Sequence, residues 1–161
     1  AATNPCPCGN YNDPQKECYC SPSIVSKYQR KISGPLMDRI DIHIEVPRIK
    51  YEKLTSEQMA ESSLEIRKRV QRARNLQQKR YASENIQTNS EMNVRQMQKY
   101  CKIDHETDSM LRAAANQMQL SGRSVHKILK LARTIADLAA SEDIKRDFIA
   151  EALQYRPKDN F

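Results

Sequence analysis

The chain is poor in aromatic residues and in glycine. It has no tryptophan, 6% aromatic residues and 3 glycines among its 161 residues. It contains no run of roughly 18 apolar residues, so we expect no transmembrane helix. It also lacks the basic-then-apolar opening segment of a secretory signal. These absences predict a cytoplasmic protein with no membrane partner.

Several catalytic signatures are missing as well. The sequence has no glycine-rich phosphate-binding loop, no Ser/His/Asp spacing and no paired catalytic carboxylates, and its 3 histidines are scattered along the chain. We therefore expect no complete active site within the chain. The chain begins at Ala1 without an initiator methionine, so we expect it to be a piece of a longer protein whose other motifs lie upstream.

Positive charge is concentrated in the middle of the chain. The net charge is +7, yet residues 1–46 carry 5 basic and 5 acidic side chains and residues 103–161 carry 9 of each. Residues 47–102 carry 13 basic and 6 acidic side chains, which is the whole excess. A basic segment between neutral ends indicates one surface for an anionic partner.

The basic residues between positions 67 and 80 form a run without an acid. On a helix they would share a face that can bind nucleic-acid phosphates by releasing counterions. A solvated helix face is the more common outcome of such a run, and no aromatic residue except Tyr81 is at hand for base stacking. Both interpretations stay open. The residues expected to contact DNA are Lys68, Arg69, Arg72, Lys79 and Arg80.

Four of the five cysteines lie in the first 20 residues. Cys6, Cys8, Cys18 and Cys20 form two Cys-x-Cys pairs separated by a spacer of 9 residues. Four thiolates can make a tetrahedral zinc site, which would be structural because no ligand position stays open. The pairs are tighter than the usual spacing of about two to four residues, and disulfides or free thiols are the alternatives.

The apolar pattern divides the chain into residues 1–47 and 48–161. The first part reads as an irregular cysteine-rich loop, a short helix over 23–31, and a strand over Ile40–Val46 in which apolar and polar residues alternate. The second part reads as a helical bundle, with a helix that starts near Thr55 and others over 90–101, 104–120, 123–140 and from 143 onward. The predicted fold class is mainly α: a helical bundle preceded by a small truncated α/β piece.

Three polar residues stand where a ligand contact can form. Arg39 lies just before the predicted strand and can reach a phosphate held by a neighbouring subunit, or pair with Asp38. Asn4 can sense a phosphate or simply open a turn. Arg123 lies in the first turn of a predicted helix, where the helix dipole favours anions over cations. It therefore either contacts a bound anion or points into solvent.

Three ordered motifs resemble one family and together span nearly the whole chain. The family is that of the magnesium-chelatase-like AAA+ ATPases, in the subgroup of the bacterial competence protein ComM. The motifs are Ala2-Thr3-Asn4-Pro5-Cys6-Pro7-Cys8-Gly9, then Ser33-Gly34-Pro35-Leu36-Met37-Asp38-Arg39-Ile40-Asp41, and finally Ser121-Gly122-Arg123-Ser124 with Ala132-Arg133-Thr134-Ile135-Ala136-Asp137-Leu138.

The resemblance implies roles for these residues. Asn4 is similar to the sensor-1 residue at the end of a core strand. Arg39 is similar to the arginine finger supplied to ATP in an adjacent subunit, with Asp38 as its partner, and Arg123 to the sensor-2 arginine of the lid. The family forms hexameric rings that hydrolyse ATP with Mg²⁺. The ComM subgroup is associated with DNA branch migration, whereas true chelatase subunits drive magnesium insertion into a porphyrin.

One departure from the family limits what the chain can do alone. The Walker A loop and Walker B strand are absent, so the chain resembles the end of the ATPase core, 1–47, followed by the helical lid, 48–161. Alone it is expected to hydrolyse no ATP. The expected function is part of a ring-forming, ATP-driven DNA motor. The alternatives are a subunit of an ATP-dependent magnesium chelatase and a stand-alone zinc and nucleic-acid-binding module.

Overall fold

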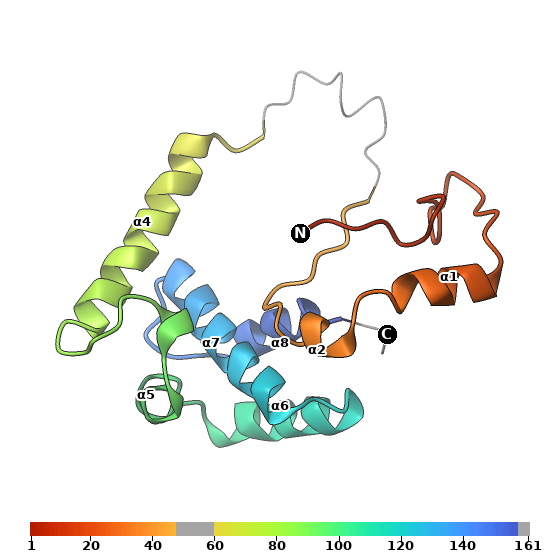
Figure 1. The fold of residues 1–161 in the computed structure, drawn as a ribbon. Helices are drawn as coiled ribbons and strands as arrows, with labels where there is room; N and C mark the ends of the chain where they lie inside the picture. The colour runs from red at the N-terminus through yellow and green to blue at the C-terminus, as the bar shows by residue number, and fades with distance from the viewer. Residues whose placement is uncertain (48–59, 158–161) are drawn as a thin grey trace. The chain divides into compact units, whose positions relative to one another are not determined.

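The computed structural model describes residues 1–47 and 60–157. These residues contain seven α-helices and one 3₁₀-helix and no strand (Figure 1). They belong to two compact units, with residues 1–47 in the first and residues 60–156 in the second. The prediction of a mainly α fold is confirmed.

The first unit is built from loops and two short helices, α1 (Pro22–Gln29) and α2 (Gly34–Met37). Each helix starts with proline in its first turn, where a missing N–H costs nothing and the fixed φ suits the helix. The side chain of Gln29 donates a 3.2 Å hydrogen bond to the carbonyl of Pro5. This bond ties the end of α1 to the cysteine-rich loop.

The strand predicted for Ile40–Val46 does not form. These residues have no regular secondary structure, and the side chains of Ile44 and Val46 are 68% and 84% exposed. A strand requires a neighbour that completes its ladder of hydrogen bonds, and residues 1–47 supply none. The strand prediction is therefore wrong for the described residues, in which the alternating apolar side chains have no sheet to join.

The second unit packs its helices around α7 (Gly122–Leu138). This helix contacts α4, η1, α5 and α8, and α6 also packs against α8. The buried core includes Ile128, Ala132 and Ala136 of α7, and Ile149 of α8. The other elements are α4 (Ser63–Arg80), η1 (Asn89–Glu91), α5 (Val94–Tyr100), α6 (His105–Gln117) and α8 (Arg146–Gln154).

Side chains that cap the helices fix where they begin. Ser62, Asp104 and Ser121 each accept a hydrogen bond from the backbone N–H three residues later. Asn93 and Gln96 form a reciprocal capping box at the start of α5. The starts predicted near positions 104 and 123 agree with these caps, whereas the start predicted near Thr55 lies outside the described residues.

Only the C-terminal half of α4 packs against the rest of its unit. Ala73 and Gln77 are buried, whereas Ile66 and Val70, nearer the start of the helix, are 42% and 45% exposed. The helix therefore contributes to the core only in its second half.

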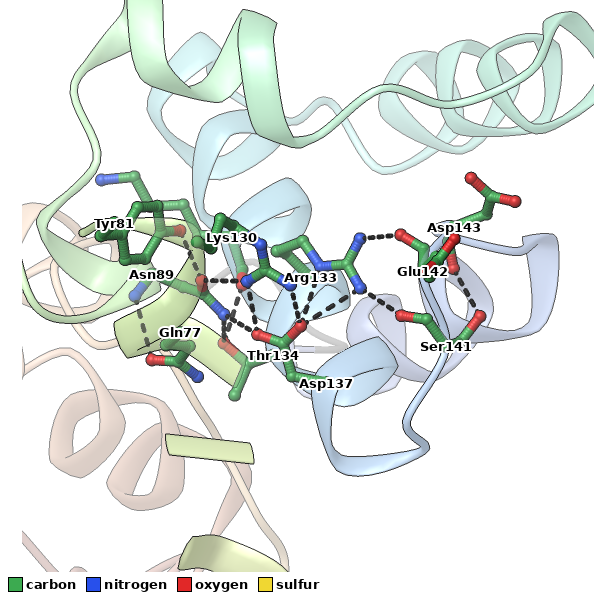
Figure 2. A network of polar contacts seen from close by, with 11 residues as sticks. Gln77, Tyr81, Asn89, Lys130, Arg133, Thr134, Asp137, Ser141, Glu142 and Asp143 are labelled. Carbon is green, nitrogen blue, oxygen red and sulfur yellow. Dashed lines mark hydrogen bonds and ion pairs between the residues drawn. The ribbon is translucent and has the colours of Figure 1, made fainter. Parts of the chain in front are cut away.

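A buried carboxylate, that of Asp137, joins the elements around α7 (Figure 2). Arg80 of α4 forms a bidentate ion pair with this carboxylate, in which Nη1 lies 2.8 Å from Oδ2. Nδ2 of Asn89 donates to the same carboxylate at 2.8 Å and to the hydroxyl of Thr134 at 3.0 Å. Three stretches of chain thus meet at one acidic side chain.

Arg133 completes this network from within α7. Its Nε lies 3.2 Å from Oδ1 of Asp137, and its Nη atoms donate at 2.6 Å to the carbonyls of Ser141 and Glu142. Burial lowers the pKa of Arg133, while Asp137 raises that of Arg80. Because two guanidinium groups share one carboxylate, removing that carboxylate leaves buried positive charge without compensation.

A second polar cluster holds the segment between α4 and α5. The carboxylate of Glu84 accepts hydrogen bonds from Gln96 at 3.0 Å, Lys99 at 3.0 Å and the hydroxyl of Tyr100 at 2.8 Å. These bonds, in that order, lower the pKa of Glu84 to about 2. The segment is therefore tied to α5 through an ionised side chain.

We predict that Asp137→Ala lowers the free energy of unfolding by about 3–5 kcal/mol, because it leaves the buried charges of Arg80 and Arg133 without their acidic partner. Chemical denaturation followed by circular dichroism measures the change. Asp108→Ala is the matched control, since it removes an exposed i,i+4 ion pair with Arg112 worth about 0.3–0.5 kcal/mol. Equal losses for the two variants would contradict the central role of Asp137.

Candidate functional site

The four N-terminal cysteines converge on one point. Their sulfurs all lie within 4.8 Å of one another. The Sγ atom of Cys6 lies 3.3 Å from that of Cys8 and 3.8 Å from that of Cys18, and Cys8 and Cys18 are 3.6 Å apart. Four sulfurs at about 2.3 Å from a tetrahedral zinc ion would be about 3.8 Å apart. The cluster therefore has the dimensions of a four-thiolate metal site.

The thiols of this cluster ionise unequally. Burial opposes ionisation of Cys6, yet hydrogen bonds from Cys8 and from the backbone of Tyr11 lower its pKa to about 6. The backbone bond from Cys20 favours ionisation of Cys18, but burial and the neighbouring cysteines raise its pKa to about 12. Adjacent thiolates repel one another, and a divalent cation among them would remove that repulsion.

A tight turn brings this loop against Asn4. The N–H of Gly9 donates to the carbonyl of Cys6 at 3.0 Å, and Gly9 has φ +79°, a conformation that glycine adopts without strain. A Cβ atom at Gly9 would lie 3.9 Å from Cγ of Asn4. The exposed side chain of Asn4 therefore rests on the cysteine loop.

Arg39 lies at the end of α2 with its side chain exposed. Its Nη1 donates a 3.2 Å hydrogen bond to the carbonyl of Pro35, and its own N–H donates to the carbonyl of Leu36 at 3.0 Å. Contacts within one helical turn therefore hold the guanidinium of this exposed side chain.

Arg123 occupies the first turn of α7, and its side chain is exposed. That turn contains no acidic residue. Because the N-terminus of a helix carries partial positive charge, Arg123 adds a cation where an anion would be favoured. Asn4 and Arg39 belong to the first unit and Arg123 to the second.

The basic face of α4 is smaller than the sequence predicted. Lys68, Arg72 and Lys79 are exposed and lie within about 40° of one another at 100° per residue. Lys68 pairs with Glu65 at 2.8 Å and stays on this face. Arg69 lies about 60–100° away from the three around the helix and pairs with Glu61 at 2.7 Å, so it is not part of the face. Lys68 and Arg72 also line a shallow surface depression on the helix.

Arg80 was predicted to be part of this basic face, but the structure places it elsewhere. Its side chain is 18% exposed and forms the ion pair with the buried carboxylate of Asp137. An acid 57 residues away in the sequence thus removes Arg80 from the surface available to a polyanion.

Among the described residues, no helix is both long and apolar enough to cross a membrane.

Comparison with known proteins decides the family. Residues 60–156 match the family described as magnesium chelatase, subunit ChlI C-terminal, and residues 1–54 match magnesium chelatase, subunit ChlI. The chain belongs to the magnesium-chelatase-like AAA+ family, ComM type. The resemblance of its three motifs is thereby confirmed.

Relatives of this ComM-type chain come from several bacteria. Competence protein ComM of Haemophilus influenzae is 35% identical over 157 residues, which is 97% of this chain. The YifB proteins of Salmonella typhimurium and Escherichia coli are each 34% identical over 160 residues, or 99% of the chain. In each case the match covers 30% of the relative, so the chain spans less than a third of these curated relatives.

Sequence reasoning about this ComM-type chain missed two buried arginine contacts. One is the pairing of Arg80 and Arg133 with Asp137. The other is Arg156, which is 5% exposed and donates to the hydroxyl of Ser124 at 2.9 Å. The i,i+4 spacing of Arg133 and Asp137 within α7 is the one local signal. The Arg80–Asp137 and Arg156–Ser124 contacts have none, because their partners lie 57 and 32 residues apart in the sequence.

Proposed function

We propose that this chain is the C-terminal part of a ring-forming AAA+ ATPase that remodels DNA. It supplies Asn4 as sensor 1, Arg39 as the arginine finger, Arg123 as sensor 2, and the helical lid. The observation that carries the proposal is the exposed guanidinium of Arg39, held by its own helical turn in a chain of this family.

Arg39 acts on a nucleotide that another subunit holds. Guanidinium is planar and always charged, and its fork of donors matches the oxygens of a phosphate. An arginine finger stabilises the charge that develops as the γ-phosphoryl group is transferred. When bound, ATP and Mg²⁺ supply the reacting phosphate and its charge neutralisation, and the chain contributes the arginine contacts from Arg39 and Arg123.

We predict that Arg39→Ala in the full-length protein lowers the kcat for ATP hydrolysis by about 10³-fold, the lower end of the effect of arginine fingers. ATP binding should remain, since the binding loop lies outside this chain. A phosphate-release assay under saturating ATP measures the loss.

Arg30→Ala is the control for Arg39, because Arg30 is an exposed arginine of the same unit at the end of α1. It should leave kcat unchanged. If Arg39→Ala retained wild-type kcat, its assignment as the finger would fail.

The four cysteines also form part of the proposal: they hold one structural Zn²⁺. The sulfurs of Cys6, Cys8 and Cys18 are 3.3–3.8 Å apart, and all four lie within 4.8 Å of one another, which suits a tetrahedron of thiolates. The loop over residues 6–20 buries only Cys6. A metal would supply the stability that apolar packing does not provide there. With four protein ligands, the ion has no open position for catalysis.

We predict about one zinc ion per chain in the purified protein, measured by mass spectrometry of the metal. Cys8→Ser should abolish stoichiometric binding, because three thiolates and a hydroxyl bind zinc more weakly. Cys101→Ser is the control, since Cys101 is buried in the second unit with its pKa raised to about 11 by burial. Full zinc content in Cys8→Ser would contradict the site.

DNA is the proposed polyanion for the basic face, now defined as Lys68, Arg72 and Lys79. These side chains project from one side of α4 and are exposed. Phosphate contacts of this kind are independent of sequence and depend strongly on salt. The face therefore supports binding to the DNA backbone rather than readout of bases.

We predict that replacing Lys68, Arg72 and Lys79 together by Gln weakens DNA binding by the full-length protein. It should also reduce the slope of log K against log salt by about 2–3, or about 0.9 per phosphate contact. The matched control replaces Arg112, Lys145 and Arg146 by Gln, which removes three exposed positive charges from other helices. Equal effects of the two triple variants would show that only net charge matters.

A protein that hydrolyses ATP but binds no DNA would instead favour the chelatase-type alternative.

A further inference from the structure

Arg156 is a buried arginine at the end of α8. Its Nη2 donates a 2.9 Å hydrogen bond to Oγ of Ser124, which is itself buried, and the two residues lie 32 positions apart in the sequence. Burying a guanidinium group is costly. The contact is therefore unlike the exposed ion pairs elsewhere on the second unit, such as Arg146 with Glu106.

The hydrogen bond from Arg156 is the last of a series of hydrogen bonds that stabilises the first turn of α7. The hydroxyl of Ser121 donates to Oγ of Ser124 at 3.2 Å and accepts the N–H of Ser124 at 3.1 Å. Arg123 lies between these two serines in the sequence. The backbone of Arg123 is thus held between Ser121, which caps the helix, and Ser124, to which Arg156 donates.

The electrostatics of this position argue against a role in stability alone. A cation near the N-terminus of a helix opposes the helix dipole, and no acid of the first turn offsets it. Two arginines, Arg123 and Arg156, are nevertheless placed at the same end of α7. A cation in the position of Arg123 is unfavourable for the helix by itself and becomes favourable when a phosphate approaches.

We propose that Arg156 is a positioning residue for Arg123. Through Ser124 it fixes the first turn of α7 so that Arg123 points at the nucleotide phosphate. This inference rests on the proposed sensor-2 role of Arg123. It assigns no contact between Arg156 and the nucleotide itself.

The test is a double-mutant cycle in the full-length ATPase, read as KM for ATP. Arg123→Ala, Arg156→Leu and Ser124→Ala should each raise KM, on the order of tenfold, because misplacing a binding group weakens a contact sharply. In the Arg123→Ala background, Arg156→Leu should raise KM no further, since it acts through the residue already removed. Arg146→Leu, an exposed arginine at the other end of α8, should leave KM unchanged.

The outcomes separate the two claims. If Arg123→Ala leaves KM unchanged, the proposed sensor-2 role fails. If Arg123→Ala raises KM but Arg156→Leu multiplies the effect, Arg156 acts independently and the present inference is overturned. Ser124→Ala breaks the same hydrogen bond but keeps the Arg156 guanidinium in place, so a folding defect specific to Arg156→Leu does not obscure the result.

Discussion

The second unit depends on the buried carboxylate of Asp137. It forms ion pairs with Arg80 and Arg133 and accepts a hydrogen bond from Asn89, so that α4, η1 and α7 are joined at one buried point. Through Arg133 the same group reaches the carbonyls that follow α7. Apolar packing brings these elements together, and this network fixes how they are oriented, because each partner satisfies a buried charge or polar group.

Helix α7 connects the network around Asp137 to the turn that contains Arg123. Its C-terminal half holds Asp137, and its first turn holds Arg123 beside Ser124 and Arg156. An α-helix of 17 residues is a rigid rod of about 25 Å. The anchored half therefore gives the exposed Arg123 a defined place, which its proposed contact with a phosphate requires. In the first unit, the α2 turn gives the same support to Arg39.

Much of the fold was predictable because its signals are local. Caps such as Asp104 and Ser121 lie within one turn of the helices they start, and the cysteine spacing indicated the cluster. Contacts between distant residues were not predictable. Periodicity assigned Arg80 to the basic face, whereas its partner lies 57 residues away. The strand over Ile40–Val46 failed for a related reason, since strands are completed by neighbours and not by their own sequence.

The central claim is that the chain completes a nucleotide site held by another subunit. Mixing two inactive full-length proteins tests it most directly: one carries Arg39→Ala, the other a substitution in its phosphate-binding loop. If Arg39 acts across the subunit boundary, mixed rings contain intact sites and ATP hydrolysis returns to a substantial fraction of the wild-type rate. If the two proteins exchange subunits and the mixture stays inactive at every ratio, Arg39 does not act in a neighbour's site and the account is wrong.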